Sequence, residues 1–274
     1  MEIRNVTAPV FVHRTGTIMA QPIQSFTVDA LPVRVYADQA ALSESVAHEV
    51  REYLSSTLAR QGSAAAILAT GNSQIQFLSR LVQGGGVDWS KITLFHMDEY
   101  LGISDTHKAS FRRYMRERVE SLVKPRAFHY LNGDCDLPLD EIEHYTRLLK
   151  AQPIDLCCLG IGENGHIAFN DPPVARFDDP HWVKLVKLDD GCKAQQFKEG
   201  HFPSIEAVPP YALTLTVPAL CSAKKMMCVA PETRKAQAVR DTLRGPIATT
   251  CPASYLRTQK QCTLLLDRDS AALL

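Results

Sequence analysis

The chain has 274 residues, of which 45% are hydrophobic and 22% are charged, a composition typical of a globular protein with a sizeable buried core. Thirty lysine and arginine residues balance thirty aspartate and glutamate residues, so the net charge does not predict binding to nucleic acid or to an anionic membrane. The N-terminal region lacks the apolar run of a secretory signal, and no segment approaches the roughly twenty apolar residues that span a bilayer. We therefore expect a soluble, cytoplasmic protein. Its eight cysteines form no C-x-x-C pair and no zinc-finger spacing, which indicates reduced thiols.

The order of the predicted elements indicates an α/β protein. Residues 1–30 contain Pro9 and Pro22 and show no helical period, so we expect an extended N-terminal arm. Strands are predicted at residues 33–36, 64–69, 92–96, 128–131, 154–159, 183–188, 212–217, 226–230 and 263–266. Helices are predicted at residues 42–58, with Asp38 as N-cap, and at 75–82, 110–123, 140–149 and 233–243. Strands and helices that alternate in this way form βαβ units, so residues 31–274 are predicted to form a single domain with a largely parallel sheet covered on both faces.

The segments that directly follow the strands hold the candidate site residues, because ligands of open α/β sheets bind at the carboxyl ends of the strands. The first segment comprises Thr70, Gly71, Asn72 and Ser73 at the start of a predicted helix. Free N–H groups and the positive end of the helix dipole favour an anion there. The segment lacks the lysine of a triphosphate-binding loop, so it indicates a phosphate monoester; a well-capped helix start without a ligand is the alternative.

Two adjacent carboxylates, Asp98 and Glu99, follow the strand predicted at residues 92–96. Successive strand residues point to opposite sides, so the two side chains are not expected to face the same ligand. One of them can act as a base while the other is a structural partner. A metal site that includes His96 is a further alternative, but the sequence shows no second cluster of ligands, and we predict no metal.

A glycine-rich segment at residues 160–165 precedes His166 and Asp171. The glycines allow the backbone to turn sharply, and an imidazole transfers protons near neutral pH. A βα turn whose histidine only packs is the structural alternative. The pattern G-x-G-x-x-G also occurs in dinucleotide-binding proteins, but there it opens a long helix, whereas here a proline pair follows at Pro172. The sequence contains no G-x-S-x-G motif, which argues against a serine hydrolase.

Three of these elements, in this order and at these separations, resemble glucosamine-6-phosphate deaminases, also called glucosamine-6-phosphate isomerases. They are the loop with Thr70 and Gly71, the element Met97-Asp98-Glu99-Tyr100, and the loop Gly162-x-Asn164-Gly165-His166-Ile167-Ala168-Phe169-Asn170. The resemblance extends from about residue 33 to residue 266 and includes the helix start at residues 233–236. It implies a three-layer α/β/α sandwich with a modified Rossmann-like, largely parallel sheet, and it implies no metal or organic cofactor.

The resemblance also implies roles for individual catalytic residues. Asp98 matches the family's proton acceptor for enolisation, and His166 matches the acid/base for ring opening. Asn164 matches a position where family members carry Asp or Asn to assist ring opening. Asp171 falls where many members have a glutamate that orients the histidine, so the reach of its shorter side chain is an open question.

The phosphate anchor of the family matches Lys235 and the segment with Thr70, Gly71, Asn72 and Ser73. Some members have a further phosphate-binding arginine. Only Lys193 or Lys198 could substitute for it in this part of the sequence.

The resemblance predicts the conversion of glucosamine 6-phosphate into fructose 6-phosphate and ammonia. Galactosamine 6-phosphate is an alternative substrate, because the epimers differ in one hydroxyl group. A 6-phosphogluconolactonase and a non-enzymatic sugar-phosphate sensor are further alternatives. The lactonase loop typically continues with small polar residues where this chain has Ile167-Ala168-Phe169, and residues 1–30 are too few and too proline-rich for the helix-turn-helix region of a sensor. We expect a hexosamine 6-phosphate as ligand, no nucleic-acid or membrane partner, and a homo-oligomer.

Overall fold

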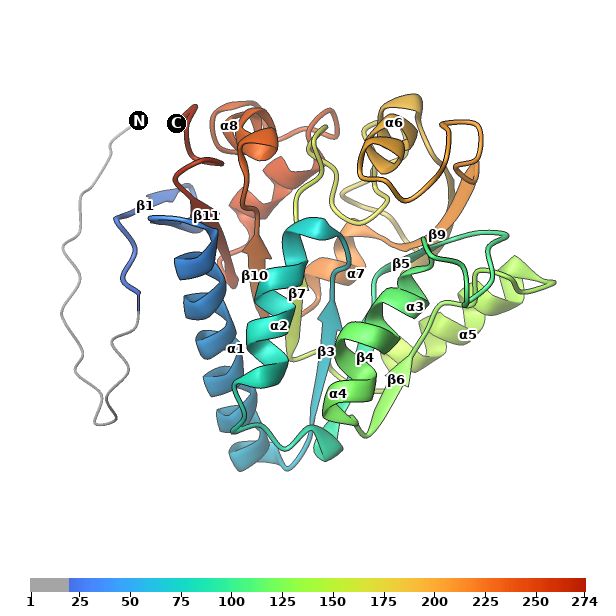
Figure 1. The fold of residues 1–274 in the computed structure, drawn as a ribbon, viewed down its shortest axis with the longest axis horizontal. Coiled ribbons are helices and arrows are strands. Elements are labelled where there is room, and N and C mark those ends of the chain that lie inside the picture. The colour runs from blue at the N-terminus through green and yellow to red at the C-terminus, as the bar shows by residue number, and fades with distance from the viewer. Residues whose placement is uncertain (1–19) are drawn as a thin grey trace.

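A computed structural model describes residues 20–274, which contain a central sheet of eight strands (Figure 1). From one edge to the other these are β1 (Gln24–Val28), β2 (Leu31–Tyr36), β11 (Cys262–Asp267), β10 (Lys225–Val229), β7 (Leu156–Leu159), β3 (Ala64–Leu68), β4 (Ile92–His96) and β6 (Ala127–His129). Neighbouring strands are parallel except for the antiparallel pair β1 and β2. The predicted largely parallel sheet is therefore confirmed.

Helices cover both faces of this sheet, so the fold has three layers (Figure 1). Alternate residues of a strand point to opposite faces: Ala65 and Ile67 of β3 pack in one buried cluster, and Ala66 and Leu68 pack in the other. One face is covered by α1 (Gln39–Gln61), α2 (Ile75–Gln83), α3 (Phe111–Met115), the π-helical turn η3 (Arg116–Glu120) and α4 (Ser121–Val123). The other face is covered by α5 (Pro138–Lys150), α7 (Val217–Cys221) and α8 (Ala236–Arg244). Short 3-10 helices are η1 (Asn72–Gln74), η2 (Trp89–Lys91), η4 (Thr233–Lys235) and η5 (Pro252–Thr258).

A second, antiparallel sheet and the helices α6 and α7 were not predicted. The sheet consists of β5 (Asp98–Tyr100), β9 (Tyr211–Leu215) and β8 (Val183–Lys187), in that order. Strands had been expected near the positions of β8 and β9, but β5 has only three residues, too few to show an alternating pattern. The helix α6 (Asp190–Lys198) has few apolar residues and no clear apolar face, so periodicity could not reveal it.

The other predicted helices and strands lie close to the positions that the apolar pattern indicated. Asp38 caps α1 as expected, since its side chain accepts a hydrogen bond from the backbone N–H of Ala41 at 2.8 Å. Of the predicted arm, residues 1–19 lie outside the described residues, and β1 forms an edge strand paired with β2. The division into an arm and one domain stays a prediction. Within residues 20–274, no helix has the length and apolarity needed to cross a membrane.

Candidate active site

The order of the strands places a pocket near the ends of β3 and β7. From β3 the chain continues through β4 to β6 on one side, and from β7 it continues to β10 and β11 on the other. The loops after β3 and β7 therefore diverge, and such a point is where α/β sheets bind ligands. A pocket lies there, lined by residues that follow β3, β4, β7 and β10 and by residues of α6.

One wall of the pocket is suited to an anion. Thr70, Gly71, Asn72 and Ser73 line it together with Lys235. Gly71 has a φ of 106°, which side chains rarely adopt, and its carbonyl accepts a hydrogen bond from the Tyr114 hydroxyl at 2.9 Å. The loop is thereby held where η1 begins, and the free N–H groups of a helix start attract anions.

Lys235 is a buried lysine at the end of η4. It is 3% exposed, and its ammonium forms no ion pair with any residue of the described part of the chain. Burial, assisted by the positive charge of Arg234, lowers the pKa of Lys235 to about 8. A negatively charged group of a ligand could therefore pair with this ammonium.

Arg234 also lines the pocket, but it is already paired with carboxylates. Its Nε lies 2.6 Å from Glu232 Oε2, and its Nη1 contacts Glu199 and, at 3.4 Å, Glu163. Burial opposes ionisation of Glu199, yet hydrogen bonds from His201 and Arg234 lower its pKa to about 2. Arg234 is therefore largely neutralised in this structure.

Lys193 and Lys198, the two predicted substitutes for a second phosphate-binding residue, are not among the residues that line the pocket. The basic side chain that lines the pocket next to Lys235 is Arg234. Sequence reasoning missed it because three carboxylates from separate segments determine its position.

The neighbours Asp98 and Glu99 have different environments, as their alternation in a strand predicts. Asp98 lines the pocket, is 6% exposed, and its Oδ1 is buried without a hydrogen-bond partner among the described residues. Burial, followed by the negative charges of Glu99 and Asp171, raises the pKa of Asp98 well above its ordinary value. A carboxylate in this setting is a stronger base than an exposed one.

Glu99 has a structural environment. Its carboxylate accepts hydrogen bonds from the backbone N–H groups of Phe111 and Arg112, at 3.1 and 2.9 Å, and thus caps α3. It also accepts a hydrogen bond from the Ser110 hydroxyl at 2.8 Å and pairs with the Arg112 guanidinium at 3.3 Å. These contacts leave Glu99 outside the pocket wall.

His166 lies in the pocket with a carboxylate beside it. Its Nδ1 is 2.8 Å from Asp171 Oδ1, so the aspartate reaches the histidine although it is shorter than a glutamate. Asn164 connects the two, because its Nδ2 donates to Asp171 Oδ1 at 2.9 Å and its Oδ1 accepts from the His166 N–H at 3.0 Å. Burial tends to raise the pKa of Asp171, but contacts with His166 and Asn164 outweigh it and lower that pKa. Asn164 and Asp171 support the histidine from behind and do not line the pocket.

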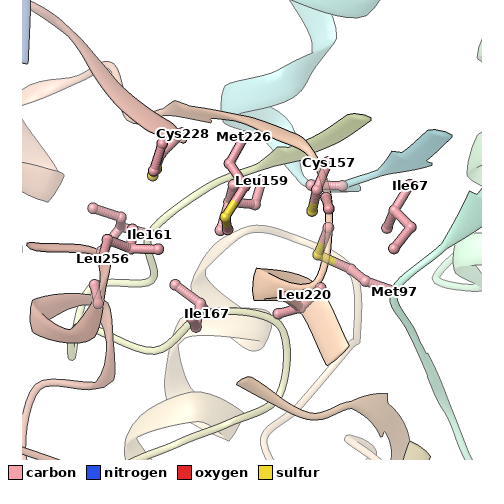
Figure 2. Close-up of a cluster of buried hydrophobic side chains, with 14 of the residues drawn as sticks. Ile67, Met97, Cys157, Leu159, Ile161, Ile167, Leu220, Met226, Cys228 and Leu256 are labelled. Atoms are coloured by element: carbon pink, nitrogen blue, oxygen red, sulfur yellow. The ribbon is translucent and has the colours of Figure 1, made fainter. Parts of the chain in front are cut away.

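The glycine pattern of this loop has a steric reason. A β-carbon on Gly162 would lie 2.2 Å from His166 Nε2, so only glycine leaves room for the imidazole ring. Ile161 and Ile167 hold the loop on the core, where both point into the cluster beneath the sheet edge (Figure 2). Asn170 fixes its far end through hydrogen bonds from Nδ2 to the carbonyls of Ile167 and Leu215, at 2.9 and 2.8 Å.

A family model and several known proteins match this chain. A family model described as glucosamine-6-phosphate isomerases/6-phosphogluconolactonase matches residues 37–265. The chain belongs to this family. Glucosamine-6-phosphate deaminase from Exiguobacterium sibiricum is 34% identical over 207 residues, which cover 76% of this chain and 80% of that protein. Glucosamine-6-phosphate deaminase 1 from Giardia intestinalis is 36% identical over 209 residues, 74% of this chain and 77% of that protein.

Solved structures of the isomerase/lactonase family share the fold. The structure of a monomeric glucosamine-6-phosphate deaminase matches with a TM-score of 0.81 at 29% identity, over 88% of this chain and 99% of that one. A 6-phosphogluconolactonase from Shewanella baltica matches with a TM-score of 0.72 at 16% identity, over 88% and 97% of the two chains. The second likeness shows the fold alone. The predicted fold class and the predicted family are confirmed.

Two features of this family member concern metal ligands. His96, considered above with Asp98 and Glu99, accepts a hydrogen bond from the Leu131 N–H through Nε2 at 2.8 Å, and burial lowers its pKa to about 3. Its ring lies in the core rather than in the pocket wall.

Within residues 20–274, the group whose ligand atoms lie close enough to hold a metal ion consists of His166, Asp171 and Cys192. Cys192 belongs to α6, a helix that the sequence did not predict.

The helix α6 and the turn after it also add polar side chains to the pocket. These are Gln195, Gln196, Glu199 and His201. Gln195 Oε1 accepts a hydrogen bond from the Glu163 N–H at 3.1 Å, which ties α6 to the histidine loop. The only sequence signal for this helix is Asp189, whose side chain caps it by accepting a hydrogen bond from the Cys192 N–H at 2.6 Å.

Proposed function

We propose that this protein converts glucosamine 6-phosphate and water into fructose 6-phosphate and ammonia. The observation that carries this proposal is that one pocket combines the buried carboxylate of Asp98, the oriented imidazole of His166 and the unpaired ammonium of Lys235. A base, an acid/base and a phosphate anchor are the three components that the reaction requires. The deaminase relatives described above support the same reaction.

The first chemical step is the opening of the pyranose ring. His166 accepts the proton of the C1 hydroxyl and delivers a proton to the ring oxygen, so the C1–O bond to the ring oxygen breaks and a C1 aldehyde forms. Asp171 Oδ1 lies 2.8 Å from Nδ1, where its charge stabilises the protonated imidazole, as the carboxylate of a catalytic triad does. Asn164 holds this carboxylate in place.

The second step moves a proton from C2 to C1. The ionised Asp98 carboxylate takes the C2 proton while the C1 aldehyde oxygen takes a proton from the substrate's ammonium group, and an enolamine forms. Return of the proton to C1 gives a ketimine, whose hydrolysis by water releases ammonia and leaves fructose 6-phosphate. Charge on a protonated substrate amine favours the ionised form of Asp98, because an opposite charge nearby lowers the pKa of a carboxyl group.

The phosphate group binds far from the reacting carbons. We assign its binding to Lys235 and the N–H groups of residues 71–73, which line the same pocket as Arg234, a second cation. Anchoring of this remote group turns the proton transfers into reactions between pre-oriented partners. A phosphate of nearly two negative charges matches the uncompensated charge of Lys235.

Ammonia release from pure protein tests the proposed reaction. Glucosamine 6-phosphate should be deaminated, and fructose 6-phosphate should appear in equal amount, with no added metal and in the presence of a chelator. Galactosamine 6-phosphate and 6-phosphogluconolactone, offered in parallel, cover the two enzymatic alternatives. Hydrolysis of the lactone without ammonia release from either amino sugar would contradict the assignment, and so would strict dependence on a divalent ion.

Loss of the Lys235 ammonium should weaken substrate binding. Lys235→Ala is expected to raise KM for the hexosamine 6-phosphate roughly ten- to a hundredfold, since a charge-assisted contact contributes about 1.5–3 kcal/mol. Lys198→Ala is the matched control, because this exposed lysine does not line the pocket, and its KM should be unchanged. An unchanged KM for Lys235→Ala would place the phosphate elsewhere.

The pH dependence of kcat/KM, compared between the wild type and Lys235→Ala, is a second test of the Lys235 ammonium. The pKa of Lys235 is about 8, so the ammonium is charged below this pH and neutral above it. Wild-type kcat/KM should therefore fall as the pH rises through about 8, and this component of the fall should be missing in Lys235→Ala. The substrate phosphate, with a second pKa of about 6, remains dianionic over this range.

Three broader features remain our proposals. We propose that the enzyme acts in the cytoplasm, which suits its eight free cysteines. We also propose a homo-oligomer, although a solved relative is described as monomeric. Light scattering of the pure protein distinguishes the two states. The choice between the gluco and galacto epimers depends on the parallel assay above.

A further inference from the structure

Three side chains with metal-binding atoms meet behind the wall of the pocket. One ligand atom each of His166, Asp171 and Cys192 lies within 4.8 Å of the others. Asp171 and Cys192 are each 1% exposed. The Oδ2 atom of Asp171 is buried and accepts no hydrogen bond from an N–H or O–H group of the described residues. The Cys192 thiol is a weak donor to the same carboxylate. A buried carboxylate oxygen without a strong donor is a poorly satisfied acceptor, which a cation can satisfy.

We propose that His166, Asp171 and Cys192 form an inhibitory binding site for Zn²⁺. An imidazole nitrogen, a carboxylate oxygen and a cysteine sulfur are the three ligand types that Zn²⁺ accepts in proteins. Mg²⁺ and Ca²⁺ prefer sites made only of oxygen atoms, so the sulfur selects against them. Three protein ligands leave the fourth position of a tetrahedral ion to water.

The separations between the three ligand atoms are somewhat longer than those around a bound Zn²⁺. With bond lengths of about 2.0–2.3 Å, ligand atoms around a tetrahedral Zn²⁺ are roughly 3.3–3.8 Å apart. The separations in this structure, up to 4.8 Å, therefore require a movement of about 1 Å. Cys192 lies in the first turn of α6, so a small shift of this helix brings the sulfur into place. The thiol proton passes to water when the sulfur–zinc bond forms.

Zinc at this position would stop the reaction proposed above. His166 could no longer transfer protons freely, because one ring nitrogen would bind the ion and the ring would be held rigidly. Asp171 would bind the metal in place of the histidine. The inhibition rests on the proposed function, whereas the binding of the ion does not, so the two can be tested separately.

Cobalt spectroscopy tests the binding site without any activity measurement. Co²⁺ added to the reduced, metal-free protein should produce a near-ultraviolet thiolate-to-cobalt absorption band, and Zn²⁺ should displace it. Cys192→Ser should lack the band, and it should bind Zn²⁺ at least about tenfold more weakly, since even the loss of an outer partner of a metal ligand costs that much. Cys251→Ser is the matched control, because Cys251 packs against Gly165 of the same loop but is not one of the three proposed ligands. The cobalt band should persist in this variant.

Measurements on the unaltered chain keep the proposal testable if Cys192→Ser folds poorly. X-ray absorption at the zinc edge should show one sulfur ligand at about 2.3 Å. Zn²⁺ should also raise Tm, because a ligand that binds only the folded state stabilises it. Absence of the cobalt band, a band that persists in a folded Cys192→Ser variant, or a zinc environment without sulfur would each overturn the proposal.

Inhibition is then measured on ammonia release. Zn²⁺ should lower the rate of the wild-type enzyme, a chelator should restore it, and Cys192→Ser should be inhibited at least about tenfold less readily relative to its own metal-free rate. If Zn²⁺ displaces the cobalt band but leaves ammonia release unchanged, the inhibitory role is overturned. If no hexosamine phosphate is deaminated even without metal, the proposed function fails while the spectroscopic result still decides the site.

Discussion

Asp98→Asn should abolish ammonia release and the exchange of the substrate's C2 proton with solvent. An amide has the shape of the carboxylate but cannot accept the C2 proton at neutral pH. Substrate binding should remain nearly intact, because the proposed phosphate anchor lies on another wall of the pocket. Proton exchange followed by NMR in deuterated water, together with KM or a binding titration, separates chemistry from affinity.

The stability of the variants provides the control for this prediction. Folding raises the pKa of Asp98, so this group stabilises the folded state only at low pH and costs stability once the pH exceeds its ordinary pKa. Asp98→Asn should therefore have a Tm at or above that of the wild type at neutral pH. Burial raises the pKa of Glu99 as well, but Glu99, unlike Asp98 Oδ1, accepts hydrogen bonds from backbone N–H groups of α3 and pairs with Arg112. Glu99→Gln, the same change one residue on, should therefore lower Tm, since it weakens the cap of α3 and removes one of the two carboxylates that pair with the buried Arg112, of which Asp134 remains. A fully active Asp98→Asn enzyme would remove the isomerase-deaminase assignment itself.

His166→Gln should reduce activity on the cyclic sugar by roughly 10²–10⁴-fold, the usual loss for a general acid/base. If the histidine acts in ring opening, an acyclic analogue that keeps the aldehyde and the amino group bypasses the affected step. The variant, relative to wild type, should therefore process the acyclic analogue much better than the cyclic sugar. Steady-state rates of both enzymes on both substrates measure this ratio.

The contacts of His166 suggest a second comparison. Asp171→Asn keeps the shape of the supporting side chain but removes its charge, so it should impair the cyclic substrate in the same selective manner, by a smaller factor. Equal impairment of His166→Gln on cyclic and open-chain substrates would show that the imidazole acts in a later step.

Local patterns in the sequence were sufficient for the framework and for several residues that line the pocket. Apolar periodicity and the cap at Asp38 depend on residues a few positions apart, so they indicated most strands and helices of the main sheet. The ends of those strands then located the Thr70 loop, Asp98 and His166, because parallel strands present their carboxyl ends at one edge. The family resemblance added Lys235, which now lines the same pocket.

Only the tertiary structure decided which of two adjacent carboxylates faces the ligand. Asp98 and Glu99 are equivalent as sequence letters, but β5 pairs with β9, more than a hundred residues later, and this pairing turns Asp98 to the pocket and Glu99 to α3. A three-residue strand has no pattern of its own, so its direction depends on its partner.

The charges of the pocket were likewise decided by contacts between distant segments. Arg234 and Lys235 are neighbours in the chain, yet Arg234 is paired with Glu199 and Glu163 while Lys235 has no counter-ion among the described residues. Cys192 came next to His166 only because α6, a helix without an apolar period, packs over the histidine loop. The free energy of a charge or a thiol depends on burial and on partners in space, and local sequence carries neither.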